Sequence, residues 1–237
     1  MSINYNPTIS TSGLVLSLDA ANKKSYPGTG TTWTDLSGNG NNFTINASAY
    51  NGTGPKYMDF NGSYGCAVTA SGSDLLISGT VTAIVWTIPL NSTANWRTLF
   101  RAESSGADHS VIIQSGGWTL GMYDGTNATG FNATAFSQQS LPGYPTQWNM
   151  MVWRWTSVAN SYYNYNFTYN NTPSTLQGYI ASGNARFKSG IRTLGAYNAA
   201  SPSQFWGSIG SISMYNRYVT DDEIVKYFNS TRGRYGI

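Results

Sequence analysis

Apolar and polar residues alternate in short runs along this chain, and turn-forming residues separate the runs. In residues 149–156, the side chains of Met151, Trp153 and Trp155 fall on one face of an extended backbone. In residues 163–169, four aromatic residues alternate with Asn and Thr, and at sheet spacing we interpret them as core rather than as a ligand platform. The pattern predicts strands at 13–19, 56–60, 64–69, 80–88, 97–101, 109–114, 117–122, 148–156, 162–169, 176–181, 191–196 and 205–216.

Turn signals built from Gly, Pro, Asn and Asp recur between these runs, for example at 26–28, 51–52 and 124–125. Short strands at this spacing are typical of an antiparallel β-sandwich or barrel. No stretch has the composition of a linker. We therefore expect one domain over residues 1–237, with a core of about 13–229 and a short extension at each end.

The last predicted strand runs directly into the only helix that we predict, at 221–229. Thr220 and Glu223 have the spacing of a capping box, in which each side chain bonds the backbone N–H of the other residue. Val219 and Ile224 stand at the positions of a hydrophobic staple around that box. Strict alternation along the strand assigns Trp206, Ile212 and Met214 to one face, and Phe205, Ile209 and Tyr215 to the other.

Charged residues make up only 10% of the chain, and Asn, Ser, Thr, Gly and Tyr take their place. Long amphipathic helices need charged faces, so this balance also favours strands with polar turns. The net charge of +3 includes no dense basic run, and no apolar run approaches the roughly 18 residues that span a bilayer. We therefore expect neither a nucleic acid nor a membrane as partner.

Two further features bear on the compartment. The first residues lack the basic and apolar regions of a secretory signal peptide, so we expect that the chain is not exported by that route. Cys66 is the only cysteine, which excludes an internal disulfide and a cluster of Cys and His ligands. We interpret it as a small buried hydrophobic residue.

Six segments, in order along the chain, carry a resemblance to a known family. Tyr57-Met-Asp-Phe-Asn-Gly62, for example, is similar to a family strand that reads F-D-F-(D/N)-G. The family is that of laminin-G-like, concanavalin A-like domains, in the version common in phage and other viral structural proteins. The similar segments are 13–43, 57–62, 81–89, 147–152, 166–171 and 205–224.

The resemblance implies an all-β fold, an antiparallel jelly-roll β-sandwich with one short C-terminal helix. The chain departs from the family at Ile84 and Ile88, where relatives often carry an acidic and a basic residue. By alternation these residues share a face with Trp86, so a surface that is often polar in relatives is expected to be apolar here. Such a patch indicates either a partner contact or cover by local loops, and both remain open at this point.

The chain contains no signature of an enzyme. Glycanases of the concanavalin A-like fold carry two carboxylates on one strand, spaced E-x-D-x-x-E, and nothing here matches. The acidic run 221–223 is explained by helix capping. Asp108, His109 and Ser110 are neighbours in sequence, but the members of a catalytic triad usually come from separate elements. We expect no catalytic residues.

Calcium is the one cofactor that the sequence leaves open, because two loops are rich in side-chain oxygens. Asp35 lies among Ser and Asn residues, and Asp124 lies near Thr126 and Asn127. Ca²⁺ binds about six to eight oxygens, typically with several carboxylates. Each loop supplies a single carboxylate, so Asp35 and Asp124 are weak calcium candidates and we expect no tight metal site.

Carbohydrate binding would use an aromatic face together with Asn or Asp hydrogen bonds. An aromatic residue near a turn can stack on a sugar ring or pack the loop onto the sandwich, and for any one residue we favour packing. The candidates near predicted turns are Trp33, Trp96, Trp118, Tyr144 and Tyr197.

Together these observations predict a non-enzymatic virion structural protein, made in the host cytoplasm. We expect a capsid decoration or minor capsid subunit that presents a lectin-like domain at the particle surface. Its expected partners are neighbouring capsid or tail proteins, while a host glycan and a second copy of the chain are left open. The alternatives are a host-glycan-binding adhesion or tail receptor-binding module and, despite the missing carboxylate pair, a glycan hydrolase or lyase.

Overall fold

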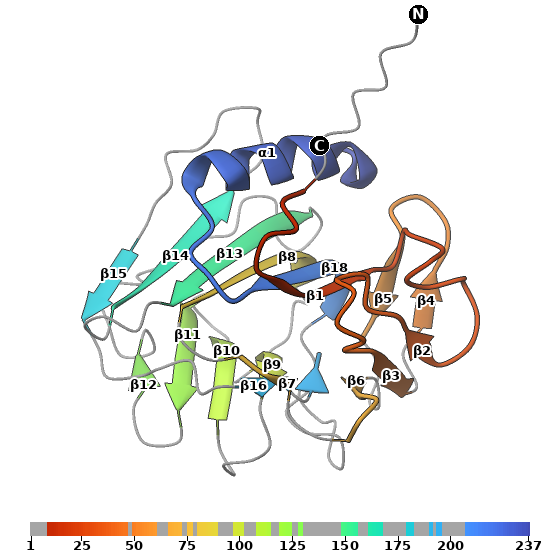
Figure 1. The fold of residues 1–237 in the computed structure, drawn as a ribbon, viewed down its shortest axis with the longest axis horizontal. Helices are drawn as coiled ribbons and strands as arrows, with labels where there is room; N and C mark the ends of the chain where they lie inside the picture. Colours follow the sequence, from red (N-terminus) through yellow and green to blue (C-terminus); the bar gives the residue numbers. More distant parts are fainter. Residues whose placement is uncertain are drawn as a thin grey trace, which may run out of the picture.

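The described residues form two large antiparallel β-sheets and one small two-stranded sheet, and the helix α1 (Asp221–Thr231) lies on the outer side of the first large sheet (Figure 1). The structure is a computed structural model. It describes residues 9–46, 49–60, 66–72, 75–77, 80–89, 97–101, 108–114, 119–124, 128–129, 148–155, 161–167, 179–182, 190–191, 193–195 and 207–237. The predicted fold class, an all-β antiparallel sandwich with a short C-terminal helix, is confirmed.

The first sheet, which we call sheet A, is the one beneath the helix. In spatial order its strands are β15 (Tyr179–Ser182), β14 (Ser161–Phe167), β13 (Asn149–Trp155), β8 (Val81–Pro89), β18 (Gly207–Tyr215), β5 (Tyr57–Asp59) and β4 (Ala49–Asn51), and β1 (Leu14–Asp19) also pairs with β18.

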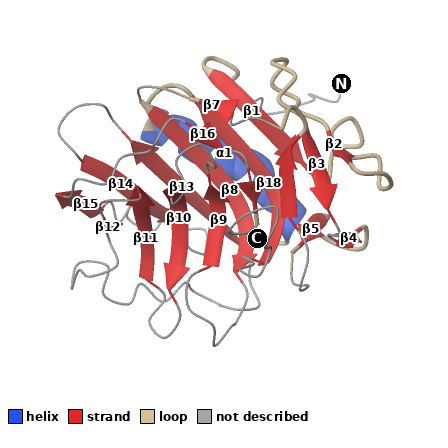
Figure 2. Cartoon of the chain, turned by 90° about the horizontal axis from the view of Figure 1, so that it is seen from below, coloured by secondary structure: helices blue, strands red, loops and turns tan. Residues whose placement is uncertain are grey.

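The second sheet, sheet B, lies on the side of sheet A away from the helix, as Figure 2 shows from below. Its strands are β12 (Ala128–Thr129), β11 (Thr119–Asp124), β10 (Asp108–Gln114), β9 (Arg97–Arg101), β17 (Thr193–Leu194), β6 (Cys66–Thr69), β3 (Phe43–Asn46) and β2 (Thr32–Trp33). Two short strands, β7 (Leu75–Leu76) and β16 (Gly190–Ile191), pair with each other.

The inner core fills the space between the two sheets. Leu16, Leu18, Phe43 and Val85 have less than 1% of their surface exposed, and Met151 only 1%. These residues come from alternate positions of strands in both sheets, as predicted for a sandwich. The side chain of Cys66 lies outside the described residues.

The side chains of β18 do not alternate strictly between the two faces of the sheet. Ile209 packs in the inner core with Ile212 and Met214, and not on the outer face with Tyr215, so its predicted face is wrong. The reason is a bulge: Ile209 pairs with Thr87, but Ser211 pairs with Trp86, which leaves Gly210 as an extra residue. One inserted residue reverses the inward and outward positions on its two sides. Trp206 and Phe205 lie outside the described residues.

The helix α1 (Asp221–Thr231) begins where the sequence predicts. Thr220 accepts from the backbone N–H of Glu223, and the Glu223 carboxylate accepts from the backbone N–H of Thr220 over 2.9 Å, which completes the capping box. Val219 and Ile224 are both buried and form the staple. The helix ends two residues later than predicted and continues as a short 3-10 helix, η2 (Arg232–Tyr235).

A second core lies between α1 and the outer face of sheet A. Ile84 is 1% exposed there, and Ile88 packs against the same cluster. Of the two alternatives for this apolar patch, the described residues therefore show cover by the chain itself. The cover comes from the C-terminal helix rather than from a loop. Helix residues such as Ile224 and Tyr227 supply the apolar surface that meets Ile84.

Trp86 is the centre of this second core. Its indole stacks on Tyr235 at 4.4 Å and on Phe228 at 5.7 Å between ring centroids. Tyr235 is buried, so the folded unit extends beyond the core boundary predicted at residue 229.

Among the described residues, no helix is both long and apolar enough to cross a membrane.

Candidate functional site at the Tyr50 loops

Five aromatic residues were predicted as candidates for sugar stacking, and the prediction is wrong for one of them, Trp33. Trp33 lies on β2, paired with Phe43 of β3, and its side chain is fully buried in the inner core. A ring without exposed surface cannot stack on a sugar. The short strand β2 was not predicted, and its alternation turns Thr32 to solvent and Trp33 inward. The other four candidates, Trp96, Trp118, Tyr144 and Tyr197, lie outside the described residues.

Asp35, the first calcium candidate, is occupied by hydrogen-bond donors. Its carboxylate accepts from the backbone N–H groups of Ser17 (2.8 Å), Ser37 (2.9 Å) and Asn41 (3.0 Å), and from the Ser37 hydroxyl (2.6 Å). The side-chain amides of Asn39 and Asn41 donate to carbonyls of β1. This network assigns Asp35 to holding its loop on β1.

The surroundings of the second calcium candidate, Asp124, are not described by the structure. Asp124 ends β11, and its side chain lies outside the described residues. Within the part of the chain that the structure describes, no three His, Cys, Asp or Glu side chains come together.

The loop after β1 (residues 20–31) and the β4–β5 hairpin (residues 49–59) bring Tyr26 and Tyr50 into contact, and we call these two segments the Tyr50 loops. The ring centroids are 4.9 Å apart and the rings are tilted by 57°. Tyr26 is buried, and its hydroxyl donates to the carbonyl of Gly30 over 2.8 Å, which fixes the loop. Burial and the neighbouring Tyr50 raise the pKa of Tyr26. Tyr50, on β4, packs against the edge of the inner core and is half-buried, so the residue keeps part of its surface in contact with solvent.

Two glycines flank the edge of the Tyr50 ring. A Cβ at Gly28 would lie 3.6 Å from Tyr50 Cε1, and a Cβ at Gly52 would lie 3.2 Å from the same atom. Gly28 has φ +104°, a conformation that other residues rarely adopt. Glycine at both positions means that neither residue places a Cβ against this atom of the ring.

Polar groups adjoin the ring on the β4–β5 hairpin. The Asn51 side-chain amide donates to the Tyr57 hydroxyl over 2.7 Å, and its oxygen accepts from the backbone N–H of Thr53 over 2.9 Å. Tyr57 in turn packs edge-on against Trp148, at 5.4 Å between centroids. The hairpin is thus held in place by the core beneath it.

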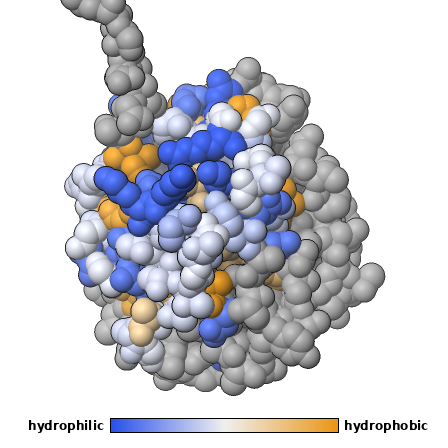
Figure 3. All heavy atoms as spheres, turned by 90° about the vertical axis from the view of Figure 1, so that its right-hand side faces the viewer, coloured by the Kyte–Doolittle hydropathy of each residue, from blue (hydrophilic) through white to orange (hydrophobic). Residues whose placement is uncertain are grey.

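This arrangement combines a partly exposed tyrosine with neighbouring amide, hydroxyl and backbone groups. Such a combination can stack on the apolar face of a sugar ring and bond its hydroxyl groups. Figure 3 views the molecule from the right-hand side of Figure 1, the side of β4 and β5, and the described surface on this face is mostly hydrophilic or of intermediate hydropathy, with a few hydrophobic patches.

Both turns at this site were predicted from the sequence, but their tyrosines were not among the proposed binding residues. Tyr26 directly precedes Pro-Gly, and Tyr50 directly precedes Asn-Gly. An aromatic residue immediately before a turn dipeptide is the signal that would have found them.

Tyr218 is the exposed aromatic residue among the described ones, with 40% of its surface accessible, whereas Tyr50 is half-buried. Its ring lies over the guanidinium of the buried Arg154, at 4.4 Å, and its hydroxyl accepts from the same group over 2.6 Å. Arg154 also pairs with Asp221 over 2.7 Å. Tyr218 is thus engaged in anchoring the start of α1 to β13.

No protein-family model matches the chain, and no curated protein matches it in sequence. Its fold is similar to solved structures at low identity. A Trypanosoma rangeli sialidase mutant with trans-sialidase activity aligns at 16% identity and a TM-score of 0.58, over 97% of this chain and 35% of the sialidase. The binding domain of botulinum neurotoxin DC, in complex with SialylT, aligns at 12% identity and 0.57, over 93% of this chain and 52% of that one.

A third solved structure is of botulinum neurotoxin type C, a toxin whose cell entry depends on interaction with two ganglioside molecules. It aligns at 12% identity and a TM-score of 0.55, over 92% of this chain and 51% of the toxin chain. The chain thus spans about a third of the sialidases and about half of the toxin domains. At these identities the similarity establishes a shared fold: this chain is an antiparallel β-sandwich of the kind found in those proteins.

Proposed function

We propose that this chain is a non-enzymatic carbohydrate-binding β-sandwich module, and that the glycan binds at the Tyr50 loops. The observation that carries the proposal is the Tyr50 ring, half-buried and flanked by Gly28 and Gly52 instead of by larger side chains. On the same hairpin the exposed Thr53 carries a hydroxyl group, and Asn51 is held in place by its bonds to the Tyr57 hydroxyl and the Thr53 backbone N–H, which leaves its second amide hydrogen for a ligand. Rigid aromatic rings with adjacent polar groups are well suited to sugars.

The similar structures support this proposal in outline. The Trypanosoma rangeli sialidase has also been solved in complex with sialic acid, and the toxin binding domain was solved in complex with SialylT. The non-enzymatic part of the proposal is supported by the lack of a paired-carboxylate motif in the sequence. The activities of the much longer sialidases do not follow from a match to a third of their length.

The setting that we propose is the surface of a virion, as a capsid decoration or tail receptor-binding module. The support is the resemblance of six segments to laminin-G-like domains of viral structural proteins. Mass spectrometry of purified particles tests the setting. Absence of the chain from particles would remove it and would leave glycan binding as a separate question.

The binding proposal is tested on a glycan array, followed by titration of the strongest ligand. We expect wild-type protein to bind, and Tyr50→Ala to lose at least about five-fold in affinity, because truncation of an aromatic anchor in a binding site costs more than about 1 kcal/mol. Tyr218→Ala is the matched control, since it removes an exposed tyrosine elsewhere. Equal losses in both variants, or no binding by the wild type, would contradict the proposal.

A further inference from the structure

The charges around the Tyr50 loops are divided unevenly between surface and interior. Residues 9–60 contain three aspartates and three lysines, so their formal charges cancel. The charges are nevertheless separated in space. The aspartate side chains bond to partners within the fold, whereas the lysine side chains lie on the loops.

Each of the three acids has partners within the protein. Asp35 is buried and accepts four hydrogen bonds, as described above. Asp19 accepts from the backbone N–H of Ala21 and pairs with Arg234 of η2. Asp59 lies on β5, opposite Ser208 of β18, and accepts a hydrogen bond from the Ser208 hydroxyl. These carboxylates therefore contribute little negative charge to the loop surface.

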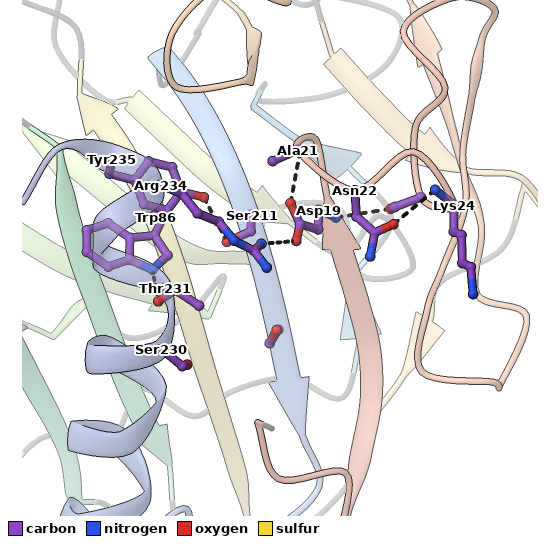
Figure 4. Close-up of polar contacts among 12 residues, drawn as sticks. Asp19, Ala21, Asn22, Lys24, Trp86, Ser211, Ser230, Thr231, Arg234 and Tyr235 are labelled. Atoms are coloured by element: carbon purple, nitrogen blue, oxygen red, sulfur yellow. Dashed lines mark hydrogen bonds and ion pairs between the residues drawn. The ribbon is translucent and has the colours of Figure 1, made fainter. Parts of the chain in front are cut away.

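The lysines are placed differently. Lys23 and Lys24 are exposed, in the same loop as Tyr26, and neither forms an ion pair with a described residue. Lys56 is half-exposed, next to Tyr57 in the β4–β5 hairpin. Figure 4 shows the Asp19 carboxylate turned toward Arg234, while the Lys24 side chain extends away from it on the far side of Asn22. The loops beside the tyrosine pair thus carry positive charge that no described acid neutralises.

We propose that the glycan bound at the Tyr50 loops is acidic, with a carboxylate-bearing sugar paired to the ammonium groups of Lys23 and Lys24. This inference rests on the proposed carbohydrate-binding function and adds the class of sugar to it. An ammonium on a flexible stem can meet a carboxylate at a solvent-exposed site, where the attraction is moderate and weakens with salt.

The test compares matched glycans that differ only in a terminal carboxylate, such as sialyllactose and lactose, by titration with wild-type protein and two variants. Lys23→Gln/Lys24→Gln removes the proposed charges. Lys226→Gln, on the exposed side of α1, is the control for the loss of a lysine elsewhere. We expect the double variant to bind sialyllactose roughly five-fold more weakly, which corresponds to about 0.5 kcal/mol for each exposed pair.

Three possible results distinguish the inference of an acidic glycan from the proposed carbohydrate-binding function itself. Stronger binding of sialyllactose than of lactose, with a salt dependence that the double variant reduces and Lys226→Gln retains, supports the inference. Equal binding of both sugars, or an unchanged affinity in the double variant, overturns it and leaves the proposed function in place. Failure of the wild type to bind any glycan overturns both, and the array of neutral and acidic sugars reports that outcome directly.

Discussion

The Trp86 indole N–H donates a hydrogen bond to the Thr231 hydroxyl over 2.9 Å, and so joins the middle of sheet A to the last residue of α1 (Figure 4). The Thr231 hydroxyl donates onward to the carbonyl of Tyr227 over 2.8 Å. Since Trp86 and Thr231 are both buried, this contact fixes where the helix ends on the sheet.

Thr231→Val is expected to destabilise the fold by about 1–3 kcal/mol, because it leaves the buried Trp86 N–H without its acceptor. Urea denaturation followed by tryptophan fluorescence measures the change. Ser230→Ala is the control: its hydroxyl also bonds the Tyr227 carbonyl, over 2.7 Å, but it is only half-buried. A Thr231→Val variant as stable as Ser230→Ala would contradict the role of the contact.

Gly210→Ala is expected to cost about 1–3 kcal/mol, because its Cβ would lie 2.5 Å from Cε1 of the buried Tyr235. The loss should come with a change in the near-ultraviolet circular dichroism of the stacked Trp86 and Tyr235. Gly233→Ala is the matched control, since nothing lies within 4 Å of the added methyl group. If the clash is the cause, Gly210→Ala should cost much less in a Tyr235→Ala background than in the wild type.

The Arg217–Glu223 pair predicts a loss of stability in acid. The hydrogen bond from Arg217, 2.6 Å long, holds the pKa of Glu223 at about 2, below its ordinary 4.5. Because the folded pKa is the lower one, the carboxylate stabilises the fold fully above pH 4.5, and the contribution is lost as the pH falls toward 2. After a discount for solvent screening we expect about 2 kcal/mol.

Unfolding free energies at pH 6, 4 and 2.5 would measure this effect. Glu223→Gln should lower the stability at pH 6 and flatten the dependence between pH 4 and 2.5, because the variant has no carboxylate to protonate there. An equally steep acid dependence in the variant would assign the acid loss to other groups.

Gly52→Ala is expected to weaken glycan binding by roughly ten-fold while changing stability by less than about 1 kcal/mol, since one methyl group beside a ligand ring is worth about 1–3 kcal/mol. The added Cβ would lie 3.2 Å from Cε1 of Tyr50 and would push against the ring edge. Titration and thermal unfolding of the same samples separate the two effects. Unchanged affinity would place the glycan away from this edge of Tyr50.

Local signals were sufficient wherever neighbouring residues decide the conformation. The capping box of Thr220 and Glu223 and the staple of Val219 and Ile224 need only a few consecutive residues, and both formed as predicted. The long strands β8, β13 and β18 were found from period-two alternation. Five short strands (β2, β3, β4, β7 and β12) were not predicted, because two to four residues give too little alternation to detect.

The candidate site was harder to predict than the fold. Trp33 stands beside turn residues in the sequence, as a sugar-stacking residue would, yet its pairing with β3 turns it into the core. Tyr26 and Tyr50 are far apart in sequence and meet only because their loops lie at the same end of the sandwich. Contacts of this kind depend on strand order, which periodicity does not report.

The sequence by itself determined the all-β class, the positions of the long strands along the chain and the start of α1, because alternation and capping are properties of neighbouring residues. The tertiary structure alone decided which surface is free. It folded α1 over Ile84 and Trp86, moved Ile209 inward through the bulge at Gly210, and left Tyr50 partly exposed. Burial depends on which elements pack together, and residues distant in the chain decide that.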